Sequence, residues 1–256
     1  MALAEMQPAD AVFTTCVWDG RGNLLDGRLH INRMKHHADR LGLQLPLSLE
    51  SEVFKQMQPH LKNESQPHRP NELLKIEVHA DGNVKISTRT LPPYQAYLRA
   101  MSIAAPRWSG AITGCKHGAW RPYLEARDIA NQHQFDIALF MHENNVVDAD
   151  RATPCLISED GVLWISSQQF GGVASTTFEA IQNKLEQQGF AIQFGCLTER
   201  MIRSCRELFV CGTGVGFAQI IEIDSIPIGS SQSITNEIHQ LYIQHQSNKI
   251  SWSSLE

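Results

Sequence analysis

The chain has 256 residues, of which 42% are hydrophobic and 19% charged, a composition typical of a soluble globular protein with one large or two medium domains. Its formal net charge of -5 disfavours non-specific nucleic-acid binding, which needs a basic surface. No apolar run reaches about 18 residues, so we expect no membrane span, and the first ten residues lack the pattern of a signal peptide, so we expect a cytoplasmic protein.

The six cysteines form no C-x-x-C pair, and the eleven histidines show no metal-ligand spacing. In a chain of this length, such cysteines are typical of reduced thiols that pack as small apolar residues. We therefore expect no disulfide framework and no metal, and histidines that are solvated or cap helices.

The first part of the chain predicts a small unit of strands and helices. In chain order we expect a strand at 12–18, helices at 29–43 and 48–61, a polar loop at 63–70, a hairpin of strands 73–78 and 84–88, and a strand at 97–104. A domain change is expected near Ala105-Pro106.

The second part predicts a larger unit. We expect a helix that ends at 131, a hairpin of strands 136–141 and 146–148, strands at 162–166, 208–211 and 220–223, helices at 175–188 and 235–244, and a loose polar tail at 244–256. Because strands and helices interleave, the sequence predicts an α/β (α+β) fold with a small N-terminal domain at 1–105 and a larger C-terminal domain at 106–256.

The stretch T-G-C-K-H-G-A-W places Lys116 among small and apolar residues, just before a charged helix face. At such a junction a lysine is partly desolvated and its pKa falls, so that the neutral amine can attack a carbonyl and form a Schiff base. The ordinary alternative is a solvated surface lysine.

Four further features gain meaning beside this lysine. Asp148 ends an apolar hairpin strand, where a carboxylate can pair with a pyridinium nitrogen. Gly172-Val173-Ala174-Ser175 opens a helix, and Gly212-Thr213-Gly214 follows a strand; both offer backbone N–H donors to a phosphate. Arg33 can bind the same phosphate through its guanidinium. Each feature alone is explained by a turn, a helix start or a surface charge, and only their order and spacing together indicate a site.

Here the sequence resembles the class IV pyridoxal-phosphate enzymes, the fold of branched-chain and D-amino-acid aminotransferases and of aminodeoxychorismate lyase. The resemblance covers about residues 11–228. Its anchors are V-F-T-T, L-H-I-N-R-M, C-K-H-G, D-I-A-L-F-M-H-E-N-N-V-V-D, F-G-G-V-A and E-L-F-V-C-G-T.

The resemblance implies a catalytic and cofactor-binding role for Lys116, the position of the lysine that forms the Schiff base with pyridoxal 5'-phosphate and moves the α-proton. Arg33 matches the arginine that holds the cofactor phosphate, with His30 one helical turn before it. Asp148 falls where the family has a glutamate on the pyridine nitrogen, and its side chain is one methylene shorter.

The remaining implied cofactor contacts lie at the two phosphate segments. Val173 and Ala174 match the backbone donors, and Thr213 matches the second phosphate-contacting loop. The chain departs from the family pattern at Ala174, which offers only its amide where a threonine is usual, and at Thr153, which replaces an asparagine.

The implied fold has two domains with the cofactor in the cleft between them, in a homodimer. Phe13-Thr14-Thr15 and Lys116-His117 look more like the lyase branch, so the first functional hypothesis is aminodeoxychorismate lyase, which forms 4-aminobenzoate and pyruvate for folate biosynthesis. The alternative is a branched-chain or D-amino-acid aminotransferase. A second alternative is a catalytically silent relative. Either enzyme acts on an amino-bearing small molecule.

Overall fold

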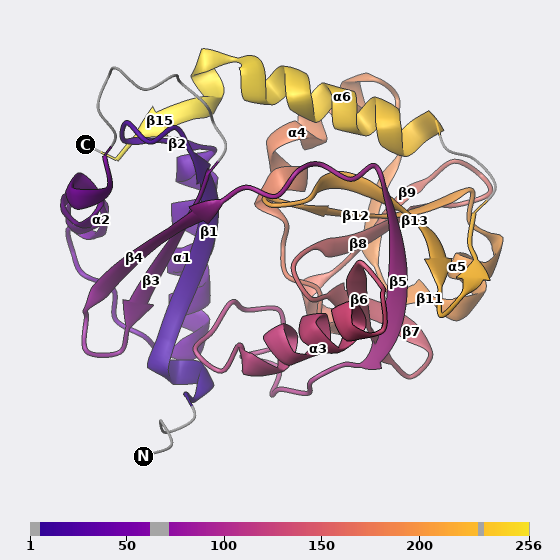
Figure 1. Ribbon diagram of the computed structural model, residues 1–256, viewed down its shortest axis with the longest axis horizontal. Helices are drawn as coiled ribbons and strands as arrows, with labels where there is room; N and C mark the ends of the chain where they lie inside the picture. Colours follow the sequence, from indigo (N-terminus) through magenta and orange to yellow (C-terminus); the bar gives the residue numbers. More distant parts are fainter. Residues whose placement is uncertain (1–5, 62–71, 230–232, 256) are drawn as a thin grey trace. The chain divides into compact units, whose positions relative to one another are not determined.

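A computed structural model describes residues 6–61, 72–229 and 233–255. The predicted polar loop at 63–70 lies outside these residues. The chain divides into two compact units, each formed by several segments (Figure 1). Unit 1 comprises Met1–Pro92, Cys115–Trp120 and Gln246–Glu256, and unit 2 comprises Pro93–Gly114 and Arg121–His245. The domain limits 1–105 and 106–256 stay a prediction.

Unit 1 is built on a five-stranded antiparallel sheet with the order β15-β2-β1-β3-β4. Seven of the eight residues of β1 are buried, because this strand lies in the middle of the sheet between β2 and β3. Two amphipathic helices bury their apolar faces in the core of this unit, with Met34, Val53 and Ile76 fully buried. The elements are β1 (Ala11–Trp18), β2 (Asn23–Leu25), β3 (Glu72–His79), β4 (Val84–Thr90), β15 (Trp252–Ser254), α1 (Gly27–Leu41) and α2 (Leu49–Met57).

The C-terminal tail is ordered, and the expectation of a loose tail is wrong. Strand β15 pairs with β2, with Trp252 opposite Leu25. The indole N–H of Trp252 donates a 2.8 Å hydrogen bond to the carbonyl of Gln246, and Leu255 is buried in the core of unit 1. The strand pairing, the indole hydrogen bond and the buried Leu255 together hold the tail in unit 1.

Unit 2 is built on a mixed ten-stranded sheet with the order β10-β9-β8-β12-β13-β5-β6-β7-β11, and β14 pairs with β13. Strand β5 runs parallel to both of its neighbours, whereas β6 and β7 form the predicted hairpin. The strands are β5 (Tyr97–Ala104), β6 (Ile137–His142), β7 (Asn145–Ala149), β8 (Thr153–Ile157), β9 (Leu163–Ser166), β10 (Ile192–Gly195), β11 (Leu197–Thr198), β12 (Glu207–Gly212), β13 (Gly216–Ile223) and β14 (Ile226–Pro227). The helices are α3 (Arg121–Gln132), α4 (Thr176–Gln187), α5 (Glu199–Ser204) and α6 (Ser233–Ser247).

The mixed α/β class predicted from the sequence is confirmed. All six cysteines are free thiols, and five of them are buried as small apolar residues. Within the described ranges, no helix combines the length and the hydropathy that crossing a bilayer requires.

Candidate active site

Lys116 lies in unit 1, on a segment that extends along β1 and is tied to α1. Its carbonyl accepts a 3.3 Å hydrogen bond from the backbone N–H of Phe13, and its own N–H donates to Nδ1 of His37 at 3.1 Å. The side chain carries Nζ to 5.2 Å from the centroid of the Phe13 ring and 4.7 Å from that of Trp120. The two rings meet edge to face, 5.1 Å apart. They hold the amine against weakly hydrated surfaces, and the cation–π contacts fix its position.

His37 is a site residue that the sequence did not reveal, and the expectation of a solvated or capping histidine is wrong here. The side chain is fully buried. Burial first, and then the positive charges of Arg33 and Lys116, lower the pKa of His37 to about 2. The ring is therefore neutral, and its Nδ1 can accept the N–H of Lys116. Its position three residues after the buried Met34, on the apolar face of α1, was the available signal.

Arg33 is oriented by a buried polar chain on α1 and β1. Its Nη2 donates to Oγ1 of Thr14 at 2.9 Å, and the same hydroxyl lies 2.8 Å from Nδ1 of His30. Burial, and then the charges of Arg33 and Lys116, lower the pKa of His30 well below its usual value. Nδ1 of the neutral ring can accept the hydroxyl proton while the hydroxyl oxygen accepts from Arg33. Since Arg33 and Lys116 both act on the same two histidines, the structure brings these two predicted residues together in unit 1.

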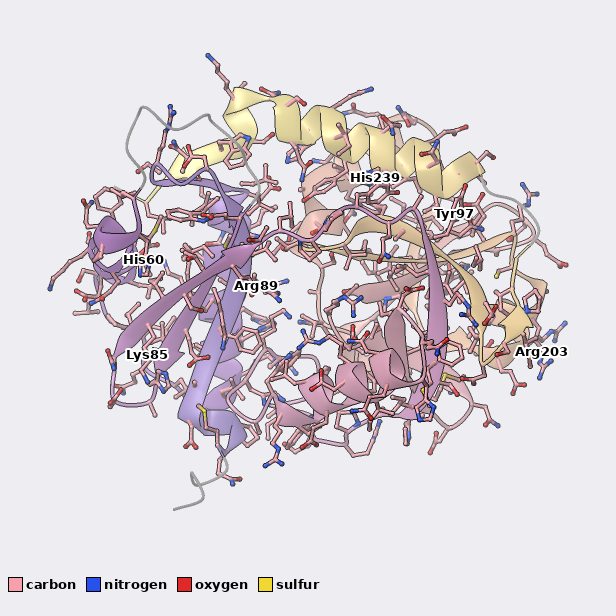
Figure 2. The ribbon with its side chains drawn as sticks, viewed as in Figure 1. His60, Lys85, Arg89, Tyr97, Arg203 and His239 are labelled. Atoms are coloured by element: carbon pink, nitrogen blue, oxygen red, sulfur yellow. The ribbon has the colours of Figure 1, made fainter. Side chains whose placement is uncertain are left out.

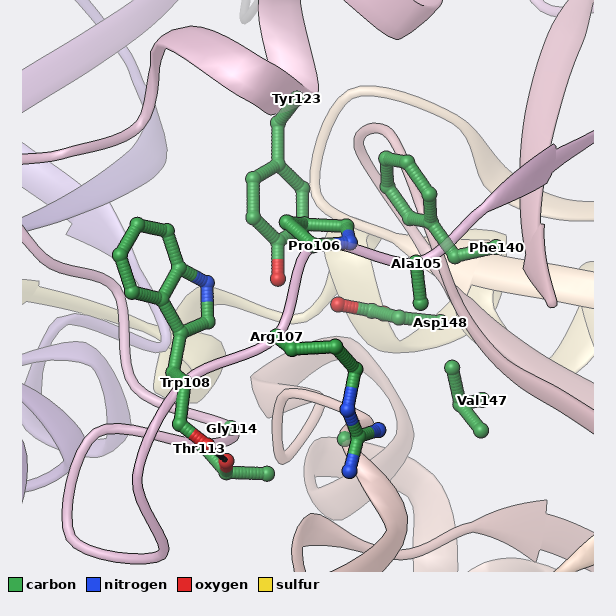
Figure 3. Close-up of a pocket in the computed structure, with 11 residues that line it drawn as sticks. Ala105, Pro106, Arg107, Trp108, Thr113, Gly114, Tyr123, Phe140, Val147 and Asp148 are labelled. Carbon is green, nitrogen blue, oxygen red and sulfur yellow. Dashed lines mark hydrogen bonds between the residues drawn. The ribbon is translucent and has the colours of Figure 1, made fainter. Parts of the chain in front are cut away.

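Asp148 lies on β7 in unit 2 and is only 3% exposed. It lines an open pocket whose atom-free space, together with the adjoining solvent, is about 310 Å³. Aromatic and aliphatic side chains form most of the wall, and Figure 3 shows the carboxylate pointing into the pocket. The lining residues are Ala105, Pro106, Arg107, Trp108, Thr113, Gly114, Tyr123, Phe140, Val147, Asp148 and Gly171.

The strand that carries Asp148 is fixed to the loop before α4. Oγ of Ser166 donates a 2.6 Å hydrogen bond to the carbonyl of Val147. Gly172 packs so closely on Ser166 that an added Cβ would come within 2.8 Å of its carbonyl and hydroxyl oxygens. Only glycine fits at position 172, and this close approach links Asp148 to the predicted phosphate-binding segment.

Val173 and Ala174 lie immediately before α4, whose first free N–H groups and dipole favour an anion. Oγ1 of the buried Thr153 donates a 2.6 Å hydrogen bond to the carbonyl of Val173. Ser175 caps the helix by accepting from the N–H of Phe178 at 3.2 Å. Thr153, which replaces the asparagine of the family pattern, therefore holds this segment in place.

Thr213 lies in the turn that joins β12 to β13, where the N–H of Val215 donates to the carbonyl of Gly212 at 3.0 Å. Just before this turn, Sγ of Cys211 lies 3.4 Å from Oγ of Ser175, the cap of α4. Both predicted phosphate segments are therefore neighbours. The structure brings together in unit 2 the predicted residues Asp148, Val173, Ala174 and Thr213.

These donors fit the chemistry of pyridoxal 5'-phosphate. In unit 1, Lys116 offers an amine for an aldehyde and Arg33 a guanidinium for a phosphate. In unit 2, the Asp148 carboxylate suits a pyridine N–H, and the amides before α4 suit phosphate oxygens. In the parts of the chain that the structure describes, no cluster of three or more His, Cys, Asp or Glu side chains could hold a metal ion. The role of each single residue stays a prediction.

Comparison with known proteins gives the same family at the level of sequence and fold. The family model Amino-transferase class IV matches residues 11–223. A search of curated protein sequences found no significant match. Among solved structures, the branched-chain aminotransferase from Thermoproteus uzoniensis with norvaline is 17% identical, over 97% of this chain and 91% of that one, with a TM-score of 0.79.

Two further solved structures have the same fold. The fold IV-transaminase CpuTA1 from Curtobacterium pusillum is 16% identical, over 93% of this chain and 85% of that one, with a TM-score of 0.77. The PLP-bound form of a hypothetical aminotransferase from Mycobacterium tuberculosis is 14% identical, over 93% and 88% of the two chains, with a TM-score of 0.76. Identities this low establish the fold alone, whereas the family model covers most of the chain. The chain belongs to the class IV aminotransferase family and is a pyridoxal-phosphate-dependent enzyme.

Proposed function

We propose that this enzyme is an aminotransferase that exchanges an amino group between an amino acid and a 2-oxo acid. The observation that carries the pyridoxal-phosphate chemistry is the position of Lys116, whose amine lies against the rings of Phe13 and Trp120 on a segment that both β1 and α1 hold in place. The choice of an aminotransferase is supported by the comparisons.

The proposed roles follow from the geometry of each unit. When bound, pyridoxal phosphate withdraws electrons from the substrate α-carbon. Lys116 Nζ would take the substrate α-proton and deliver it to the aldehyde-derived carbon of the cofactor, and the rings beside it would keep bulk water away from the amine. Asp148, buried on β7, holds a proton on the ring nitrogen of the cofactor. Arg33, the amides of Val173 and Ala174, and Thr213 hold the phosphate.

The comparisons support the aminotransferase alternative better than aminodeoxychorismate lyase. The matching family model describes aminotransferases, and the similar structures reported above are named as transaminases or aminotransferases. Both reactions need the same lysine and the same buried carboxylate, so the site alone favours neither. The fate of the amino group separates them.

The test is a half-reaction followed by absorbance. The purified enzyme is loaded with pyridoxal phosphate and given each enantiomer of norvaline, leucine and glutamate without a 2-oxo acid. An aminotransferase converts the cofactor to its aminated form, and a 2-oxo acid restores the original spectrum. A lyase leaves the cofactor in its original form and releases 4-aminobenzoate and pyruvate from aminodeoxychorismate.

Two variants control this experiment. Lys116→Ala abolishes the conversion, and borohydride no longer fixes the cofactor covalently to the chain. Lys85→Ala changes an exposed lysine of β4 (Figure 2) and keeps both properties. An enzyme that shows no protein-bound cofactor band after loading would contradict the proposal and favour the catalytically silent relative.

A further inference from the structure

The pocket around Asp148 in unit 2 contains one acidic and one basic side chain. Arg107 follows β5 and lines this pocket from the loop opposite the Asp148 strand (Figure 3). The residue is exposed, and its guanidinium has no hydrogen-bond or ion-pair partner within residues 6–61, 72–229 and 233–255. A ligand that fills the pocket therefore meets a carboxylate on one side and an available guanidinium on the other.

The backbone around Arg107 is constrained on both sides, so the side chain starts from a defined place. Pro106 fixes the preceding φ angle. After Trp108 the loop folds back on itself, because the hydroxyl of Thr113 donates to the carbonyl of Trp108 at 3.2 Å and to that of Ser109 at 3.0 Å. Such a loop loses little conformational entropy when Arg107 binds a ligand.

Opposite charges at one pocket select a ligand that carries an N–H or a cation at one end and an anion at the other. The predicted phosphate ligands of the cofactor are Arg33, Val173, Ala174 and Thr213, and none of them lines this pocket. The anion that remains for Arg107 is the carboxylate of the amino substrate. A guanidinium holds a carboxylate through two parallel N–H···O bonds, which fixes its orientation as well as its position.

We propose that Arg107 binds the substrate carboxylate and thereby makes this enzyme favour amino acids and 2-oxo acids over simple amines. The aromatic side chains of Trp108, Tyr123 and Phe140 in the same wall suit an apolar group next to that carboxylate. The inference rests on the proposed aminotransferase function and names the residue that would define its substrate class.

The experiment compares norvaline with butylamine, which is norvaline without its carboxylate, in the wild type, Arg107→Gln and Arg107→Lys. Arg107→Gln should raise the KM for norvaline about 10- to 100-fold with a smaller change in kcat, and leave the rate with butylamine unchanged. The KM of Arg107→Lys for norvaline should lie between the values of the wild type and Arg107→Gln. Lysine keeps the positive charge but cannot form the two parallel hydrogen bonds of a guanidinium. Arg203→Gln, on the exposed face of α5 (Figure 2), is the matched control and should behave as wild type.

Two binding measurements keep this test separate from that of the proposed function. The Kd of 4-methylvalerate, a carboxylate that lacks the amino group and cannot react, is measured by calorimetry on the loaded enzyme, as is the Kd of pyridoxal phosphate on the apoenzyme. Weaker 4-methylvalerate binding in Arg107→Gln, with unchanged cofactor binding, supports the inference even if no amino acid is converted. An unchanged Kd for 4-methylvalerate overturns it, and so does a loss confined to cofactor binding, which would make Arg107 a phosphate ligand.

Discussion

At the residue scale, the main feature of unit 1 is that one aromatic ring contacts two lysines. The Phe13 centroid lies 5.2 Å from Nζ of Lys116 and 4.7 Å from Nζ of Lys75. Lys75 has its own counter-charge, because it forms an ion pair with Glu77, which also contacts His79. Burial alone would raise the pKa of Glu77, but Lys75 and His79 hold it below its usual value. The ionised Glu77 thus offsets the charge of Lys75 near Lys116.

His37 gives a pH dependence whose sign follows from its neutral state. Its folded pKa, about 2, lies below the value of about 6.5 for an unfolded histidine. Between about pH 6.5 and pH 2, the unfolded chain therefore binds a proton at this histidine that the folded chain does not bind. The free energy of unfolding is highest above about pH 6.5 and decreases as the pH falls towards 2. This loss amounts to about 1.4 kcal/mol per pH unit. His37→Asn, whose Oδ1 can accept the N–H of Lys116, should make the free energy of unfolding less dependent on pH by that amount.

Urea unfolding at several pH values between 7.5 and 5 measures this slope. The control is His36→Asn, which changes the adjacent, exposed histidine and should leave the slope as it is. If His37→Asn and the wild type lose stability in parallel as the pH falls, the neutral buried ring is not the cause.

At the element scale, the long amphipathic helices and the hairpins were predictable, because their apolar residues repeat with a clear period. The predicted strand at 97–104 agrees with β5, and the predicted helix at 175–188 agrees with α4 to within one residue. Strand β8 was missed because its five buried residues show no alternation and include Pro154, which counts against a strand within a sheet. The three residues of β15 were missed because such a short strand takes its structure from its partner β2.

The tail provides a matched pair of substitutions that tests whether β15 is part of the fold. Leu255 is 6% exposed and packs in the core of unit 1, whereas Ile250 is 90% exposed. Leu255→Ala should lower the free energy of unfolding by about 2–4 kcal/mol, since it opens a cavity, while Ile250→Ala should change it by less than about 0.5 kcal/mol. Chemical denaturation measures both, and equal, negligible effects would mean that the tail is detached in solution.

At the scale of the whole molecule, the fold is kept in relatives that share only 14–17% of their residues with this chain. Family membership could be predicted from about six short motifs. The sequence also indicated Lys116, Arg33 and Asp148, because their order and spacing beside the two glycine-containing segments predict one site. It did not indicate His37, Ser166 or Arg107, whose roles depend on contacts between segments far apart in the chain. The homodimer implied by the resemblance remains a prediction.

Cofactor binding should be visible as stabilisation of the folded chain. A ligand at about 100 times its Kd stabilises the state it binds by about 2.7 kcal/mol, which raises the melting temperature. Adding pyridoxal phosphate to apoenzyme should therefore raise the Tm, and this shift should be smaller for Arg33→Gln in unit 1 and for Asp148→Asn in unit 2. Differential scanning fluorimetry measures it, with Arg203→Gln as the control. If both variants show the same rise in Tm as the wild type, neither Arg33 nor Asp148 contacts the cofactor.

The contact between Gly114 and Gly172 has a consequence for anyone who wishes to redesign the enzyme's catalytic scope. Gly114 has a φ of +76°, and a Cβ there would lie 2.9 Å from the carbonyl oxygen of Gly172. A Cβ at Gly172 would in turn lie 2.8 Å from oxygens of Ser166. Neither glycine can therefore be replaced by a residue with a side chain. Saturation libraries should leave both glycines fixed and randomise Arg107, Trp108 and Tyr123 instead. Clones that carry a new side chain at 114 are then expected to be lost at the level of expression, before selection for a new reaction begins.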